Sequence, residues 1–176
     1  MIRKKFQDIT IELTKGDITN QPDIDAIVNA ANAFLRTGGG VAGAIHEAAG
    51  PDLEKESVSL GPIKPGQAVI TSAYKLPNKN VIHCLGPVYQ RDLPHDKLLA
   101  SCYSNSLELA DKYDLKSIAF PAISTGAFGY PIEEAAKVAL NAIKEKTPFL
   151  NSVKIVRMVL FSDSDYDAHE VVFKKW

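Results

Sequence analysis

The sequence has few cysteines, almost no net charge and no long apolar run. Its 2 cysteines, Cys84 and Cys102, lack the spacing of a metal or redox site, which favours small buried apolar side chains. The 20 Lys and Arg nearly balance the 21 Asp and Glu, which excludes a field that would attract bulk nucleic acid or an anionic membrane. No apolar run is long enough to span a bilayer, and none follows the basic start to form a secretion signal. We therefore expect a soluble cytoplasmic protein.

The chain length fits one globular domain. Of its 176 residues, 45% are hydrophobic, and a chain of this size buries about two thirds of the surface that its unfolded form exposes. No internal repeat, low-complexity tract or flexible linker divides it. We predict a single domain over residues 1–176, and a near-neutral domain of this size is most simply a monomer.

Helical and strand periodicities follow one another along the chain. Helices alternate with strands in the second half, whereas adjacent strands open the first half, and this pattern predicts a three-layer α/β/α domain with a mixed, mostly parallel central sheet. Strands are expected over residues 6–13, 26–29, 69–72, 81–84, 117–121 and 154–161. Helices are expected over residues 39–49, from 51 to near 61, over 98–113, over 131–146 and from about 166 onward.

Two glycine-rich loops each follow an expected strand and open an expected helix. The first is GGGVAG at residues 38–43, and the second is ISTGAFG at residues 123–129. Backbone N–H groups at such a helix start can face an anion. One loop can bind a monophosphate, whereas two facing loops suit a diphosphate that links two larger groups. For either loop taken alone, an ordinary glycine-rich turn is the alternative.

The first loop matches the pattern G-x-G-x-x-G without the context of a dinucleotide-binding fingerprint. Residues 32–37 separate the strand from the first glycine, and the helix leads to Gly61 and Pro62 rather than directly to a parallel strand. Ala44 and Ile45 stand where a Walker loop needs Lys and Ser or Thr. We therefore expect neither a conventional dinucleotide oxidoreductase nor a P-loop enzyme.

The order of five segments carries a resemblance to a known family. The segments are GDIT at 16–19, IVNAAN at 27–32, GGGVAGAI at 38–45, VIHCLGP at 81–87 and IAFPAISTGAFGY at 118–130. Together they resemble the macrodomains, which bind ADP-ribose, and the likeness covers essentially the whole chain. The resemblance implies ADP-ribose, O-acetyl-ADP-ribose or ADP-ribosylated proteins as partners, and it implies no cofactor.

The resemblance also implies roles for individual residues. Asp17, beside Ile18, would accept a hydrogen bond from the adenine amino group, and Phe161 would lie against the adenine face. Phe128 would pack on the distal ribose, whose hydroxyls Asn32 would hydrogen-bond. Without the family, Asp17 is a turn or cap residue and Phe161 a core residue. Main-chain N–H groups on two walls would hold the diphosphate: Gly38, Gly39, Gly40, Val41 and Ala42 on one, and Ser124, Thr125, Gly126, Ala127 and Phe128 on the other.

Macrodomains divide between binding modules and enzymes that remove groups from the distal ribose. In the hydrolytic branch the loop reads GGVDG, and its aspartate acts with an asparagine before the loop and a histidine after it. Asn32 and His46 stand at the matching places and are the candidate catalytic residues, but Ala42 replaces the aspartate, and a methyl group cannot act as a base. Relatives that read GGVAG, notably viral macrodomains, resemble hydrolases nonetheless. Hydrolysis and pure binding both stay open, and a structural role is the alternative for His46.

The sequence offers little other site chemistry. His83 and Cys84 are adjacent, but His46, His95 and His169 stand far apart without ligand spacing, so we predict no metal site. The acidic run at residues 163–167 lacks the remaining ligands of a calcium loop and is typical of a helix start.

Overall fold

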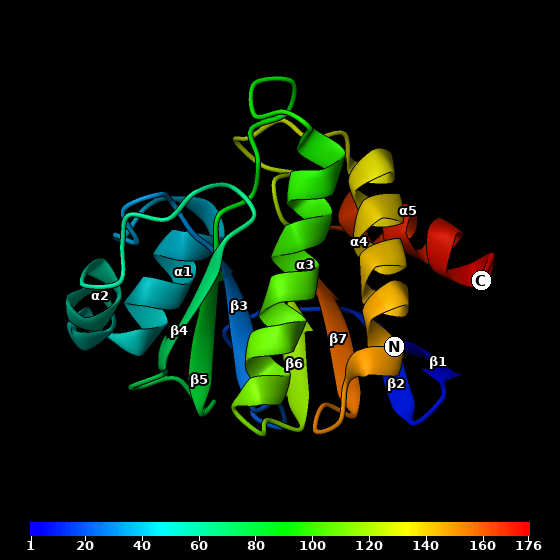
Figure 1. The fold of residues 1–176 in the computed structure, drawn as a ribbon, viewed down its shortest axis with the longest axis horizontal. Helices are drawn as coiled ribbons and strands as arrows, with labels where there is room; N and C mark the ends of the chain where they lie inside the picture. Colours follow the sequence, from blue (N-terminus) through cyan, green and yellow to red (C-terminus); the bar gives the residue numbers. More distant parts are fainter.

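The computed structural model describes all of residues 1–176 and is built on one seven-stranded sheet (Figure 1). The strand order is β1-β2-β7-β6-β3-β5-β4. The edge pairs β1–β2 and β5–β4 are antiparallel, and the inner pairs are all parallel, so the prediction of a mixed, mostly parallel sheet is confirmed. The strands are β1 (Ile2–Phe6), β2 (Ile9–Lys15), β3 (Ala26–Ala30), β4 (Ala68–Ser72), β5 (Asn80–Cys84), β6 (Ser117–Phe120) and β7 (Ile155–Leu160).

Helices cover both faces of the sheet and complete the three layers. They are α1 (Gly40–Ala49), α2 (Pro51–Val58), α3 (His95–Lys112), α4 (Ile132–Lys146) and α5 (Asp163–Lys174), with a short 3-10 turn η1 (Thr147–Phe149) after α4. One apolar cluster joins α3, α4 and α5 to one face of the sheet, which Val28 and Phe120 help to form. A second cluster joins α1 and α2 to the other face through Ile27 and Ala119. Neighbouring residues of one strand thus enter opposite clusters, as the pleat requires.

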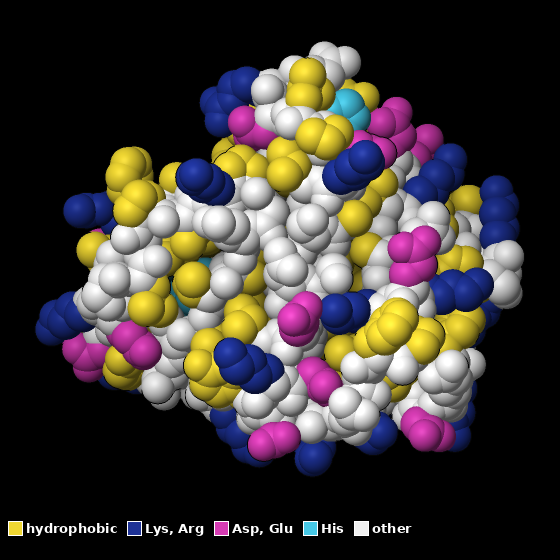
Figure 2. Space-filling model, viewed as in Figure 1, with side chains coloured by type: hydrophobic (Ala, Val, Ile, Leu, Met, Phe, Trp, Pro, Cys, Tyr) yellow, Lys and Arg dark blue, Asp and Glu magenta, His cyan; other side chains and the backbone are white.

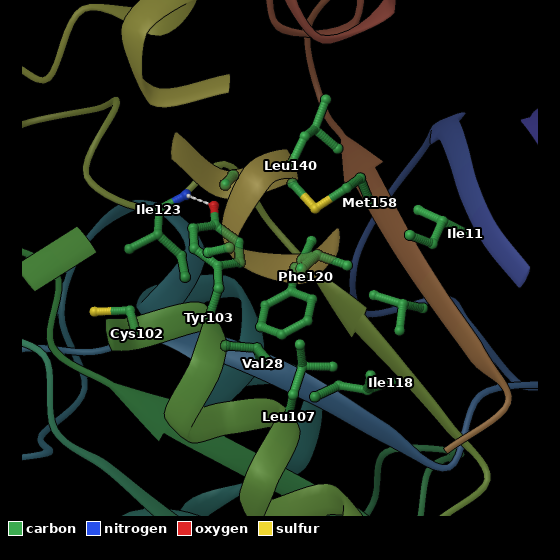
Figure 3. Packing of buried hydrophobic residues seen from close by; sticks show 14 of the residues in the cluster. Ile11, Val28, Cys102, Tyr103, Leu107, Ile118, Phe120, Ile123, Leu140 and Met158 are labelled. Carbon is green, nitrogen blue, oxygen red and sulfur yellow. Dashed lines mark hydrogen bonds between the residues drawn. The ribbon is translucent and has the colours of Figure 1, made fainter. Parts of the chain in front are cut away.

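The larger cluster also anchors the backbone that leaves β6 (Figure 3). Tyr103 of α3 is buried, and its hydroxyl donates to the carbonyl of Pro121 at 3.3 Å and accepts from the N–H of Ile123 at 3.3 Å. These two bonds satisfy backbone groups at the point where the chain leaves the sheet. Helix α3 therefore fixes the start of the second glycine loop.

The first strand prediction is wrong in its bounds. Residues 6–13 do not form one strand, because β1 ends at Phe6 and β2 begins at Ile9, with Gln7 between them at a positive φ of 54°. Phe6 is instead the last residue of a separate edge strand, in which three charged residues stand between Ile2 and Phe6. Edge strands carry such charges because they deter pairing with other chains.

The last helix begins earlier than expected. It starts at Asp163 rather than near residue 166, because the Ser162 hydroxyl accepts the N–H of Asp165 at 3.1 Å and caps the helix. The acidic run is therefore a helix start, as predicted. Both cysteines are buried, also as predicted.

Charges of both signs are interspersed on the face shown in Figure 2, and no patch of a single sign stands out there. None of the helices has both the length and the apolar composition that a membrane crossing requires.

Candidate functional site

A cavity of ≈ 320 Å³ opens at the carboxyl ends of β3, β5 and β6. In a parallel sheet this edge is the usual place for a ligand, because the loops that leave neighbouring strands meet there. The structure brings residues of the two glycine loops together in the lining of this one cavity. Its lining residues are Ala30, Ala31, Asn32, Gly38, Gly39, Gly40, Val41, Ala42, Gly86, Ala122, Ile123, Ser124, Gly126, Ala127 and Phe128.

The first loop presents a helix start without a side-chain cap. Gly39 is the N-cap of α1, and no side chain hydrogen-bonds to the N–H groups of the first turn. These groups are therefore left for an anion. Gly43 allows the loop to lie close to the helix, since a Cβ at Gly43 would stand 2.5 Å from the carbonyl oxygen of Gly38. Only glycine fits this close approach.

Asn32 has a structural as well as a predicted ligand role. Its Nδ2 donates to the carbonyl of Arg36 at 2.7 Å, and its Oδ1 accepts the N–H of Arg36 at 3.0 Å. Each end of the amide keeps one further donor or acceptor, because a primary amide has two protons and two lone pairs. Asn32 thus holds the approach to the first loop and still faces the cavity.

The second loop is held by its own backbone and by the segment after β5. Ser124 adopts a left-handed φ of 68°, and its carbonyl accepts the N–H of Tyr130 at 2.9 Å. The N–H of Tyr89 donates to the carbonyl of Phe128 at 2.9 Å. A Cβ at Gly86 would stand 2.1 Å from the Ser124 hydroxyl, so the two segments touch across this glycine. Of the predicted residues in this loop, only Thr125 does not line the cavity, and its hydroxyl donates to the carbonyl of Ala122 at 2.8 Å.

Asp17 and Phe161, which were predicted to meet adenine, and Ile18 beside Asp17 lie outside the cavity, along the same edge of the sheet. The N–H of Gly16 donates to the carbonyl of Leu160 at 2.9 Å, so Asp17 and Phe161 follow the ends of the paired strands β2 and β7. Phe161 is 79% exposed, so its interpretation as a core residue is wrong. Ile18 is buried.

The side chain of Asp17 forms a local turn, as its sequence position also suggested. Its Oδ1 accepts the N–H of Thr19 at 2.8 Å and the Thr19 hydroxyl at 2.7 Å. Both bonds fall on one oxygen, so the second oxygen is left for a ligand.

His46 is a buried residue of α1 and does not line the cavity. It is buried, and neither ring nitrogen has a hydrogen-bond partner. Burial lowers the pKa of His46, with the Glu54 carboxylate opposing this shift, so the ring is neutral at pH 7. The structure therefore gives His46 a buried place on α1, outside the cavity lining, and its predicted catalytic role stays a prediction.

Sequence reasoning missed a buried polar chain next to His46. Asn29 donates through Nδ2 to Nδ1 of His83 at 3.0 Å, and the protonated Nε2 of His83 then donates to the Thr71 hydroxyl at 2.9 Å. Burial lowers the pKa of His83 to about 3. The rings of His46 and His83 lie 6.2 Å apart between centroids. This neutral chain ties β3, β5 and β4 together, and Asn29 directly precedes Ala30, which lines the cavity.

Comparison with known proteins identifies the family. The family model described as Macro domain matches residues 28–139, which include both glycine loops. The chain belongs to the macrodomain family. A macro domain-containing protein of Caldanaerobacter subterraneus subsp. tengcongensis is 48% identical over 94% of this chain and 96% of its own length. The ADP-ribose glycohydrolase MACROD2 of Xenopus laevis is 49% identical over 91% of this macrodomain, which corresponds to 39% of that longer protein.

A solved structure agrees over the whole chain. A variant of the Oceanobacillus iheyensis macrodomain, solved with ADPR (ADP-ribose), has a TM-score of 0.94 and 40% sequence identity and covers 99% of this chain and 97% of its own. The family that the five sequence segments indicated and the α/β/α fold that the order of helices and strands predicted are thus confirmed.

Proposed function

We propose that this macrodomain binds ADP-ribose along the carboxyl edge of its sheet and hydrolyses groups attached to the distal ribose. The substrates would be O-acetyl-ADP-ribose or mono-ADP-ribosylated proteins. The observation that carries the proposal is the meeting of two glycine loops at one cavity, with Asp17 and Phe161 beside it at neighbouring strand ends. Similar proteins support it, since one is solved with ADPR and another is named an ADP-ribose glycohydrolase.

The spacing of the strands matches an extended dinucleotide-like ligand. Strands β7 and β3 are separated by β6 alone, so two strand spacings, about 10 Å, divide the end of β7 from the end of β3, where the cavity opens. Adenine would lie on Phe161, with its amino group donating to Asp17. The diphosphate would then reach the two loops, and the distal ribose would lie beside Asn32 and Phe128.

The diphosphate would be held by main-chain groups rather than by cations. No Lys or Arg lines the cavity, whereas the uncapped N–H groups at Gly39 and in the first turn of α1 are free. Backbone N–H groups and a helix N-terminus bind anions without a basic side chain. This arrangement suits a ligand that is held, not a phosphate that is transferred.

Hydrolysis would proceed without a side-chain base at the loop. Ala42 presents only a methyl group, and His46 is buried and neutral. The ligand's own phosphate and the loop amides would position the water, which adds to the acyl carbon. The acyl–oxygen bond then breaks, and the ribose oxygen takes the proton. The same lack of a base favours the second candidate function, an ADP-ribose reader without turnover.

Turnover measurements with excess enzyme separate the two functions. Asn32→Ala should lower the release of the acyl or ADP-ribosyl group 10-fold or more, about 1.4 kcal/mol of barrier, and reduce ADP-ribose affinity less. Ala42→Asp should accelerate release, although repulsion of the diphosphate will weaken binding. A wild type that binds ADP-ribose but releases nothing from O-acetyl-ADP-ribose or from a glutamate-modified protein is a reader.

A further inference from the structure

A buried ion pair lies directly under the segment that carries Asp17. Glu12 of β2 and Arg157 of β7 are register partners, and they are 3% and 5% exposed. The Nε of Arg157 donates to Oε2 of Glu12 at 2.6 Å. Both side chains lie on the opposite face of their strands from the neighbouring Ile11 and Met158, which pack in the larger apolar cluster. The ion pair therefore lies on the face that residues 16–25 cover.

The guanidinium of Arg157 holds this segment at two side chains. Its Nη1 donates to Oε1 of Gln21 at 2.9 Å, and both of its terminal nitrogens donate to the carboxylate of Asp23, at 2.9 and 2.7 Å. The hydrogen bond to Asp23 raises the pKa of Arg157, and the same bond lowers the pKa of Asp23, so both stay charged. A planar guanidinium fixes the direction of each acceptor that it meets.

Gln21 passes this restraint on to Asp17. Its Nε2 donates to the carbonyl of Asp17 at 2.8 Å, so the one amide accepts from Arg157 and donates to Asp17. Asp17 follows the last ladder bond of β2, at Gly16, and its carbonyl otherwise accepts only the N–H of Asn20 at 3.1 Å. The amide link therefore connects the buried ion pair to the backbone of the residue proposed to read adenine.

We propose that Gln21 is a positioning residue, held by Arg157, that sets the base selectivity of the site by fixing the backbone of Asp17. The inference rests on the proposed function, because it presumes that Asp17 meets the adenine amino group. A carboxylate selects a donor only while it is held in place, since a mobile acceptor satisfies itself with water. Loss of the hydrogen bond from Gln21 should therefore change the preference between bases more than it changes the binding of the diphosphate.

The substitution Gln21→Glu tests the link. A glutamate still accepts from Arg157 but has no N–H for the Asp17 carbonyl. Affinity would be measured by calorimetry for ADP-ribose and for its inosine analogue, which has no amino group to donate. The variant should reduce the preference for ADP-ribose about 3- to 10-fold, the usual effect of one lost hydrogen bond. If the glutamate variant does not fold, Gln21→Met, which adds no charge, takes its place and should reduce the preference for ADP-ribose in the same way.

Asn78→Ala is the matched control. Asn78 donates to the carbonyls of Gln21 and Ile24, at 2.8 and 2.7 Å, and so holds the same segment without the link to Asp17. It should lower Tm but keep the preference. A Gln21 variant with a lower Tm but the wild-type preference for ADP-ribose over the inosine analogue overturns this inference and leaves the proposed function standing. A wild type that binds no ADP-ribose overturns the proposed function, and a wild type without base preference overturns the role of Asp17 and hence of Gln21.

Discussion

Gly126 and Gly43 offer a matched pair of alanine substitutions. No atom lies within 4 Å of a Cβ built on Gly126, and its φ is outside the left-handed region, so alanine fits the ligand-free protein. Alanine there should raise the free energy of unfolding by about 0.4–1 kcal/mol, because it restricts the unfolded chain. The open space lies at the cavity, where the diphosphate would approach the second loop. ADP-ribose affinity should fall at least about 10-fold, or 1.4 kcal/mol.

Gly43→Ala should lower the free energy of unfolding, whereas Gly126→Ala should raise it. Its Cβ would stand 2.5 Å from the carbonyl oxygen of Gly38, which is backbone and cannot swing away. Such overpacking costs about 1–3 kcal/mol, so Tm should fall by roughly 2–12 °C. Thermal unfolding and calorimetric titration of both variants make the test. If Gly126→Ala binds ADP-ribose as tightly as the wild type, the second loop does not contact the ligand and the proposed placement is wrong.

Three further predictions address adenine and pH. Asp17→Ala should weaken ADP-ribose binding by about 1–3 kcal/mol and remove the preference over the inosine analogue in calorimetry; unchanged values would leave Asp17 a turn residue. Phe161→Ala should leave Tm unchanged because the ring is exposed, yet weaken binding by about 1–3 kcal/mol; a drop in Tm alone would contradict this. His83 has a pKa of about 3 against an ordinary 6.5, so the unfolded chain takes its proton first as pH falls. The contribution of neutral His83 to the free energy of unfolding is complete above pH 6.5 and falls by about 1.4 kcal/mol per pH unit below it. The free energy of unfolding measured with denaturant should therefore be about 2 kcal/mol lower at pH 5 than at pH 7, and this difference should be smaller in His83→Gln.

Local patterns in the sequence were enough to predict most strands of the sheet and both glycine loops. Short apolar runs and strand–loop–helix order are short-range signals, and they located β3, β6 and the loops that line the cavity. The turn at Gln7 carries no Gly, Pro or Asn, so the division of β1 from β2 was missed. The early start of α5 depends on one serine cap, which the acidic run obscured.

Contacts between distant positions could not be derived from the sequence. Arg157 and Glu12 are 145 positions apart, and Asn29 and His83 are 54 apart, so neither buried pair leaves a local pattern. The exposure of Phe161 likewise depends on where β7 ends relative to β2. The sequence therefore indicated which residues belong to the site, whereas the register of the parallel strands decided which of them line the cavity and which are buried outside its lining.

The most direct test is a calorimetric titration of the purified wild type with ADP-ribose. The two loops, Asp17 and Phe161 predict one site per chain with a Kd in the micromolar range, roughly −7 to −9 kcal/mol. NAD should compete poorly, because its nicotinamide would have to fit beside Asn32 and Phe128 in a cavity of ≈ 320 Å³. No heat and no thermal shift at millimolar ADP-ribose would contradict the account, and tight binding of NAD in its place would revive a dinucleotide site.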